Sequence, residues 1–143
     1  MHHIASIHSN IDPRSLLVNN RFRGSHVTPK KVRAAMDELS SLAAEQATFT
    51  PDKDIRFALD LSYTFPSMRG DVDGPVKRTI DAVFRGFRRR IDSSFVNDGR
   101  VIWLRATKLV GSPATDIEVW SFLHGEDISE HLRRLEMGEK TGN

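Results

Sequence analysis

Three aspartates and one lysine are the side chains of this sequence whose types and spacing are best suited to chemistry. Asp71 and Asp73 flank Val72 in a loop after an alternating apolar segment, and Asp98 comes just before a later apolar segment. If the loop backbone is extended, the first two carboxylates point the same way. Mg²⁺ accepts a few carboxylates and keeps water and substrate phosphate oxygens as its other ligands. The spacing therefore predicts a Mg²⁺ site, with the ordinary alternative that these acids only cap a helix and form a turn.

Lys77 lies four residues after Asp73, in the first turn of a predicted helix. The positive end of a helix dipole disfavours a cation by a few tenths of a kcal/mol. Two explanations are open: an ion pair with Asp73 or Asp81, or a position beside a phosphate held by the metal. Lys30 and Lys31 repeat this placement in another predicted helix. Cations beside free helix N–H groups suit phosphate, so two such helices favour a nucleic-acid ligand.

The charges are segregated along the chain, although the formal net charge is only +2. Residues 13–36 hold six basic and no acidic side chains, and residues 77–90 hold six basic side chains and one acidic one. Residues 116–143 are acidic, with a net charge of −4. Two basic blocks predict a surface that binds a polyanion. The alternative is that both blocks are solvated helix faces.

The length and composition favour one globular domain in the cytoplasm. The 143 residues are 38% hydrophobic and 28% charged, which fits a single domain with a substantial core and not a disordered chain. No apolar run is long enough to span a bilayer, and the first residues lack the apolar stretch of a signal peptide. Cysteine is absent, which excludes disulfides, thiolate zinc sites and thiol catalysis and is compatible with the cytosol.

The periodicity predicts a single α+β domain in which a small mixed sheet is covered by helices. Strict alternation of apolar and polar residues marks the clearest strand, and prolines at positions 29 and 75 suit the first residue of a helix. The predicted elements are an arm over 1–15, a short strand or irregular segment around 16–18, a helix over 29–46, a strand over 55–65, a helix over 75–91, two strands over 101–110 and 117–123, a helix over 127–137 and a loose tail over 138–143. We expect residues 111–114 to join the last two strands as a hairpin.

These residues resemble the signature of RusA-type Holliday-junction resolvases. The family has Asp-X-Asp-Asn, then Lys and Asp-Ala-Leu, and it has Asp-Asp-X-X-Val before a later strand. The similar segments here are Asp71-Val72-Asp73, Lys77, Asp81-Ala82-Val83 and Asn97-Asp98-Gly99-Arg100-Val101. Upstream, Asn19-Asn20-Arg21-Phe22 resembles Asn-Asn-Arg-Tyr, and Ser25-His26-Val27-Thr28 resembles Thr-His-Val-Ser. The sequence departs from the family pattern at Gly74, where the family has Asn, and at Asn97, where it has Asp.

The resemblance implies a Mg²⁺-dependent endonuclease that resolves four-way (Holliday) DNA junctions by phosphodiester hydrolysis in recombination and repair. It implies that Asp71, Asp73 and Asp98 bind the metal and that Lys77 is the essential cation. Two cuts in a symmetric junction need two active sites, which favours a homodimer. The residues expected to bind DNA are Arg21, Lys30, Lys31, Arg69, Arg88, Arg89 and Arg90. The alternatives are a non-catalytic nucleic-acid-binding module on the same fold, and an interaction protein that uses its terminal helix.

Overall fold

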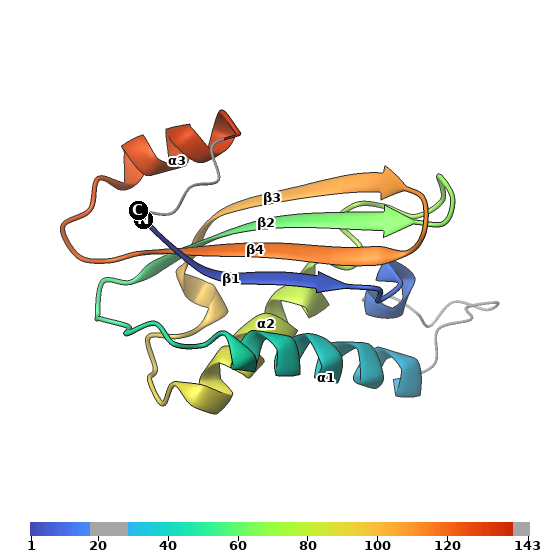
Figure 1. Ribbon diagram of the computed structural model, residues 1–143, viewed down its shortest axis with the longest axis horizontal. Helices are drawn as coiled ribbons and strands as arrows, with labels where there is room; N and C mark the ends of the chain where they lie inside the picture. Colours follow the sequence, from blue (N-terminus) through green and yellow to red (C-terminus); the bar gives the residue numbers. More distant parts are fainter. Residues whose placement is uncertain (18–28, 139–143) are drawn as a thin grey trace.

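Within residues 1–17 and 29–138, which the computed structural model describes, a four-stranded mixed sheet carries two α-helices on one face and a third on the other (Figure 1). The strands are β1 (His2–Ser9), β2 (Arg56–Phe65), β3 (Val101–Val110) and β4 (Ala114–Phe122), and the helices are α1 (Pro29–Glu45), α2 (Val76–Arg90) and α3 (Ile128–Glu136). The strand order is β1-β4-β2-β3, with β3 parallel to β2 and β4 antiparallel to both of its neighbours. The single α+β domain and the mixed sheet are therefore confirmed.

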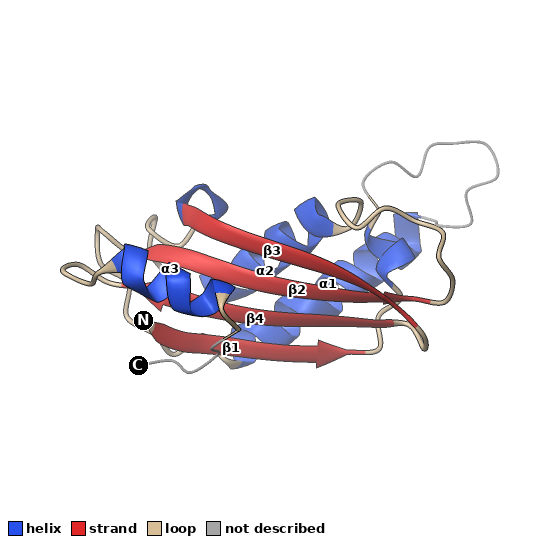
Figure 2. Ribbon diagram, turned by 90° about the horizontal axis from the view of Figure 1, so that it is seen from above, coloured by secondary structure: helices blue, strands red, loops and turns tan. Residues whose placement is uncertain are grey.

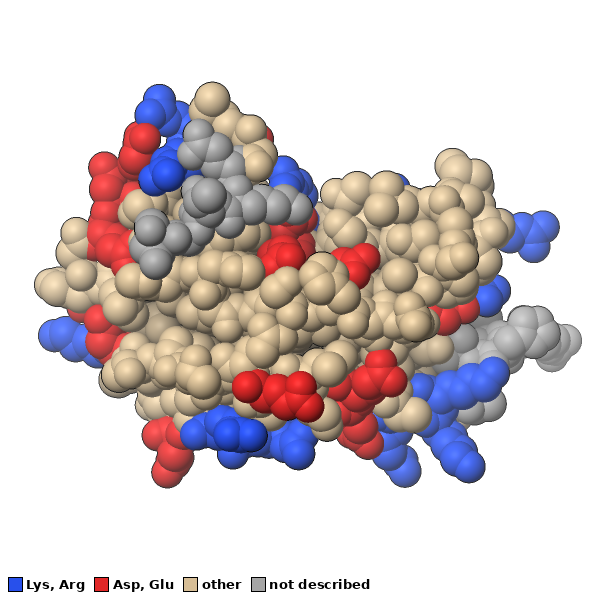
Figure 3. All heavy atoms as spheres, viewed as in Figure 1, with Lys and Arg blue, Asp and Glu red and all other residues tan. Residues whose placement is uncertain are grey.

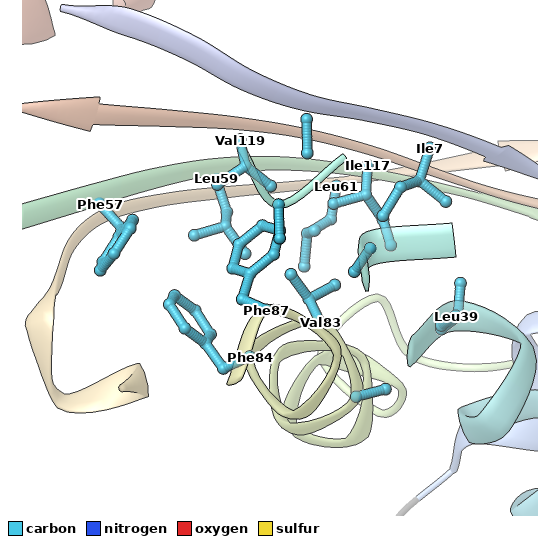
Figure 4. Close-up of a cluster of buried hydrophobic side chains, with 14 of the residues drawn as sticks. Ile7, Leu39, Phe57, Leu59, Leu61, Val83, Phe84, Phe87, Ile117 and Val119 are labelled. Carbon is cyan, nitrogen blue, oxygen red and sulfur yellow. The ribbon is translucent and has the colours of Figure 1, made fainter. Parts of the chain in front are cut away.

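The main core lies between the sheet and the pair α1 and α2. The inward-facing residues of β2 are fully buried there, and apolar residues of both helices, β1 and β4 pack against them (Figure 4). The labelled members are Ile7, Leu39, Phe57, Leu59, Leu61, Val83, Phe84, Phe87, Ile117 and Val119. Burying one such side chain contributes about 1.5–3 kcal/mol, so this layer fixes α2, and the loop that leads into it, against the sheet.

The N-terminal segment is a strand of the sheet and not the arm that the sequence predicts. β1 pairs antiparallel with β4 along its length. Ala5 and Ile7 are buried, whereas Ser6 and His8 hydrogen-bond with acidic side chains of β4. Because only small or isolated apolar residues alternate with histidine and serine, the period-two signal is too weak to recognise. Of the two alternatives predicted around 16–18, a short strand or an irregular segment, the strand is not found where the chain is described, since Pro13–Leu16 is a short 3₁₀ helix and Leu17 follows it outside any strand.

β3 and β4 do not form the predicted hairpin, because β2 lies between them. β2 is buried on nearly its whole length, whereas β3 is largely half-buried or exposed. The strand with most apolar surface takes an interior position, where it has a neighbouring strand on each side and its apolar face packs against the helices. The short connection after β3 crosses the end of β2, where the Gly111 N–H donates to the Phe65 carbonyl at 2.9 Å.

The third helix, α3, covers one end of the opposite face of the sheet (Figure 2). The Asp127 side chain caps it by accepting from the Glu130 N–H at 3.1 Å. Leu132 and Leu135 pack into a small second cluster around Trp120. None of the helices in the described part of the chain is long and apolar enough to cross a membrane.

α1 and α2 lie side by side and run in the same direction (Figure 1). Arg33 and Arg78, near the two helix starts, line one groove. Near the two helix ends, Arg89 Nη1 donates to Ser41 Oγ at 3.3 Å. Both helices therefore begin at the same end of the molecule, and their positive dipole ends point the same way.

The two helices pack tightly against each other at Gly86. Ser40 Oγ donates to the Ala82 carbonyl at 2.7 Å, across the helix pair. A Cβ atom at Gly86 would lie 2.2 Å from the Ser40 carbonyl oxygen and 2.9 Å from Ala43 Cβ. Only glycine fits this contact, so the distance between α1 and α2 depends on Gly86.

Candidate active site

Most of the predicted catalytic residues line one pocket between α2 and the edge strand β3. The pocket has a volume of about 470 Å³, and its charged lining consists of Asp73, Lys77, Asp81 and Asp98. Its other walls are apolar residues of α2, β3 and the loop before α2. Three of the four catalytic residues predicted from the sequence thus line the same pocket, although they are up to 25 positions apart in the chain.

Asp71 is the predicted residue that the structure does not place in this pocket. The chain from Asp71 to Pro75 forms a turn, in which the Gly74 N–H donates to the Asp71 carbonyl at 3.2 Å. The two carboxylates would point the same way only along an extended backbone, and this backbone turns. Asp73 consequently lines the pocket with Val72, whereas Asp71 is exposed outside it.

Asp98 reaches the pocket from the other side, as the first residue of the short 3₁₀ helix η2 (Asp98–Arg100). The Asn97 side chain caps η2 by accepting from the Gly99 N–H at 3.0 Å, and its amide donates to the Ser94 carbonyl at 2.7 Å. Asn97 therefore shapes the turn that positions Asp98, which gives this departure from the family pattern a structural role.

The start of α2 is anchored to the sheet by a short hydrogen-bond chain. The Tyr63 hydroxyl donates to Thr79 Oγ1 at 2.8 Å, and the Thr79 hydroxyl donates to the Pro75 carbonyl at 2.8 Å. Burial raises the pKa of Tyr63, and the hydrogen bond with Thr79 only partly opposes that rise. The phenol therefore stays protonated and holds in place the first turn of α2, which carries Lys77.

The loop over 66–75 is anchored by Lys108 of β3, a residue that no sequence pattern singled out. Lys108 Nζ donates to the carbonyls of Met68 and Gly70, the latter at 2.7 Å, and lies 5.5 Å from the centre of the Phe65 ring. Gly70 has φ +102°, a conformation that favours glycine. These contacts fix the path of the chain immediately before Asp71.

Lys77 pairs with Asp81, one of the two ion-pair partners expected from the sequence. Lys77 Nζ is 3.5 Å from Asp81 Oδ2, and the two side chains are 70% and 39% exposed. Such an exposed pair contributes about 0–1 kcal/mol, which is too little to prevent Lys77 from turning towards a phosphate. Asp81 was not predicted as a pocket residue. The sequence signal that could have indicated it is its position four residues after Lys77.

The carboxylates of the pocket suit Mg²⁺ by type but do not form a closed cage. Among the described residues, no three His, Cys, Asp or Glu side chains are grouped closely enough to hold a metal ion. Mg²⁺ is commonly bound through one or two carboxylates together with water and substrate phosphate. Asp73 and Asp98 fit this incomplete type of site, in which the substrate supplies part of the coordination.

The residues predicted to bind DNA do not form one cluster. Lys30 and Lys31 are exposed in the first turn of α1, and Arg69 is exposed in the loop before α2. The basic residues 88–90 lie at the far end of α2. A helix of this length is about 22 Å long, so they are about that far from its start. Figure 3 shows basic side chains along the lower edge of the molecule, with acidic ones between them. Arg21 falls outside the described residues.

Positive charge dominates near the start of α1. Partial burial raises the pKa of Asp12, but hydrogen bonds and charge from Arg14, with the charge of Lys31, lower it below its usual value overall. Neither α1 nor α2 has an acidic residue in its first turn. This end of the helix pair therefore offers a favourable environment for an anion.

Comparison of the sequence with models of protein families found no match, and no curated protein matches it. The likeness to RusA-type resolvases accordingly stays a prediction that depends on the motifs.

Proposed function

We propose that this chain is a Mg²⁺-dependent DNA endonuclease of the RusA type, which resolves four-way junctions in recombination and repair and acts as a cytoplasmic homodimer. The observation that supports this function is the meeting of Asp73, Lys77 and Asp98 in one open pocket. Carboxylates that suit Mg²⁺ and a lysine beside them are groups that can promote phosphodiester hydrolysis.

Each pocket residue has a distinct part in the proposed reaction. Asp73 and Asp98 are the residues that would hold Mg²⁺, which when bound supplies Lewis acidity towards the phosphodiester. Lys77 leaves its ion pair with Asp81 and stabilises the negative charge that develops at the phosphate. The hydrogen bond between Tyr63 and Thr79 keeps the first turn of α2 in place while this charge develops.

A non-catalytic nucleic-acid-binding module is the second candidate. Two observations favour it: Lys77 already has an ordinary i,i+4 ion-pair partner, and the described residues contain no complete metal cage. This candidate predicts that DNA binding persists in EDTA and that no nicked product forms in Mg²⁺.

The test is single-turnover cleavage of a labelled four-way junction and of a duplex with the same sequence, in Mg²⁺ and in EDTA. We expect Mg²⁺-dependent cleavage of the junction in preference to the duplex. Asp73→Asn should abolish cleavage and leave junction binding unchanged or tighter, because it removes a negative charge facing DNA. Lys77→Ala should lower the cleavage rate by roughly 10²–10³, by analogy with losing one preorganised electrostatic donor.

The matched controls are Asp92→Asn and Lys53→Ala, which make the same charge changes at exposed positions outside the pocket lining. Both controls should cleave at the wild-type rate. Normal cleavage by Lys77→Ala at saturating enzyme and Mg²⁺ would remove Lys77 from the mechanism. Junction binding without any cleavage by the wild-type protein would establish the binding module instead.

A further inference from the structure

A second groove, separate from the pocket, lies between α1 and α2 near the starts of both helices. It has a volume of about 310 Å³ and is lined by Pro29, Val32, Arg33, Met36, Arg78 and Arg85. Among the described residues, its charged lining consists of three arginines, one from α1 and two from α2. An apolar floor with several guanidinium groups is suited to a ligand that carries phosphate groups.

Arg85 is held in a fixed position at this groove. Its Nη2 donates to Asp37 Oδ1 at 2.7 Å and its Nε donates to Ser40 Oγ at 3.0 Å. A guanidinium has five N–H donors, so these two contacts with described residues leave three for a ligand. Since Asp37 and Ser40 already order the side chain, binding a phosphate there loses little additional side-chain entropy.

The arginines of α2 form a row that continues beyond the groove. Arg78, Arg85 and Arg89 lie seven and four residues apart, which places them on one side of a helix. Arg89 also reaches α1, where its Nη1 donates to Ser41 Oγ at 3.3 Å. At 1.5 Å per residue the row is about 16 Å long, which corresponds to about five nucleotides of a B-form strand at 3.4 Å each.

The row runs beside the pocket on the same helix. Lys77 and Asp81 line the pocket towards β3, whereas Arg78 and Arg85 line the groove towards α1. Because successive residues of a helix are about 100° apart, the two sets occupy neighbouring sides of α2. A strand held along the arginine row would therefore pass next to the pocket.

We propose that the groove between α1 and α2 binds the sugar–phosphate backbone of the DNA through Arg33, Arg78 and Arg85. This inference rests on the proposed function for the identity of the ligand. Within the two basic blocks it selects Arg33, Arg78 and Arg85, which were not among the residues expected from the sequence to bind DNA. An acidic polypeptide is the other polyanion that could fit, but the length of the row along one side of α2 favours a repeating phosphate chain. The contacts give affinity without sequence readout, because they reach no base.

The test measures binding of a fluorescent four-way junction by anisotropy in EDTA, so that no cleavage occurs, over a series of salt concentrations. The variants are Arg33→Gln, Arg78→Gln and the double variant, with Arg85 retained because it also links α2 to α1. We expect the slope of log affinity against log salt to fall by about 0.9 for each lost phosphate contact. Arg33→Lys and Arg78→Lys should keep most of the slope, since they keep the charge.

Arg133→Gln is the matched control, because Arg133 is an exposed arginine of α3 on the opposite face of the sheet. It should leave the slope unchanged. An unchanged slope in the double variant, an equal fall in the control, or displacement of the junction by polyglutamate as efficiently as by unlabelled DNA would each overturn the proposal.

Cleavage in Mg²⁺, measured in parallel, separates this inference from the proposed function. If the double variant loses salt-dependent binding but the wild-type protein never cleaves DNA, the groove binds DNA and the protein is not a nuclease. If the double variant cleaves and binds DNA as the wild type does, the protein is a nuclease and the groove does not bind DNA. Absence of any DNA binding by the wild-type protein would overturn both.

Discussion

Replacing Gly86 by alanine tests the close contact between α1 and α2. The new Cβ would lie 2.2 Å from the Ser40 carbonyl oxygen, whereas a carbon–oxygen contact needs about 3.3 Å. The shortfall of about 1 Å is against helix backbone, which cannot turn away as a flexible side chain does. Overpacking of this kind costs about 1–3 kcal/mol, and we expect the upper end of that range.

The measurement is urea unfolding followed by far-UV circular dichroism, with thermal unfolding beside it. A loss of about 3 kcal/mol in a chain of this size lowers Tm by about 10 °C. Gly111→Ala is the control, because its Cβ would meet only Thr64 Cγ2 at 3.4 Å, an ordinary contact. A Gly86→Ala protein as stable as the control would show that the contact at Gly86 does not set the distance between the two helices.

Three further substitutions test other contacts. Tyr63→Phe removes the donor to Thr79, and we expect a loss of about 1 kcal/mol in urea unfolding together with slower cleavage; unchanged values for both would show that this bond does not position α2. Arg105→Leu removes the guanidinium that donates to both oxygens of Asp60, which is 5% exposed, and should cost about 2 kcal/mol in the same assay. Burial, with nearby positive charge, lowers the pKa of His131 below its usual 6.5, so the unfolded chain binds this proton more readily and stability should fall as the pH drops below 6.5. His131→Phe should flatten that pH dependence. An unchanged dependence of stability on pH would show that His131 does not cause it.

Elements with strong local signals were predictable from the sequence. β2 was expected from the alternation over 55–65, and α2 was expected from Pro75 and the apolar residues that follow it at helical spacing. Both lie within one residue of their predicted limits. In each case the local pattern and the tertiary contacts favour the same structure, which is why the local pattern is sufficient.

The order of the strands was not predictable in the same way. Nothing in the residues between β3 and β4 shows that their connection passes over β2, because that arrangement depends on which strand has most apolar surface to bury. β1 was missed since its two buried residues, Ala5 and Ile7, give little hydrophobic signal. Pairing between strands distant in the sequence is decided by the assembled core and not by the segment itself.

The candidate site was predictable in its residue types but not in its geometry. The spacing of Asp73 and Lys77 places both near the start of α2, as expected. The exclusion of Asp71 depends on the turn after it, and the inclusion of Asp81 depends on which side of α2 faces β3. The contact of Lys108 with the loop joins residues that are about 40 apart, so no local motif indicates it.

The position of β4 between β1 and β2 affects how the chain folds during synthesis. Of the four described strands, β4 leaves the ribosome last, yet His2 pairs with Ser121 and Phe57 also pairs with Ser121. Until β4 emerges, β1 has no partner in the sheet and the apolar strand β2 has an open edge, a condition that promotes association between chains. The segment from β2 through α2 to β3 can assemble earlier, because its strands are nearer in sequence. We therefore expect slow completion of the sheet, governed by non-local pairing, and aggregation of nascent chains that stop before β4.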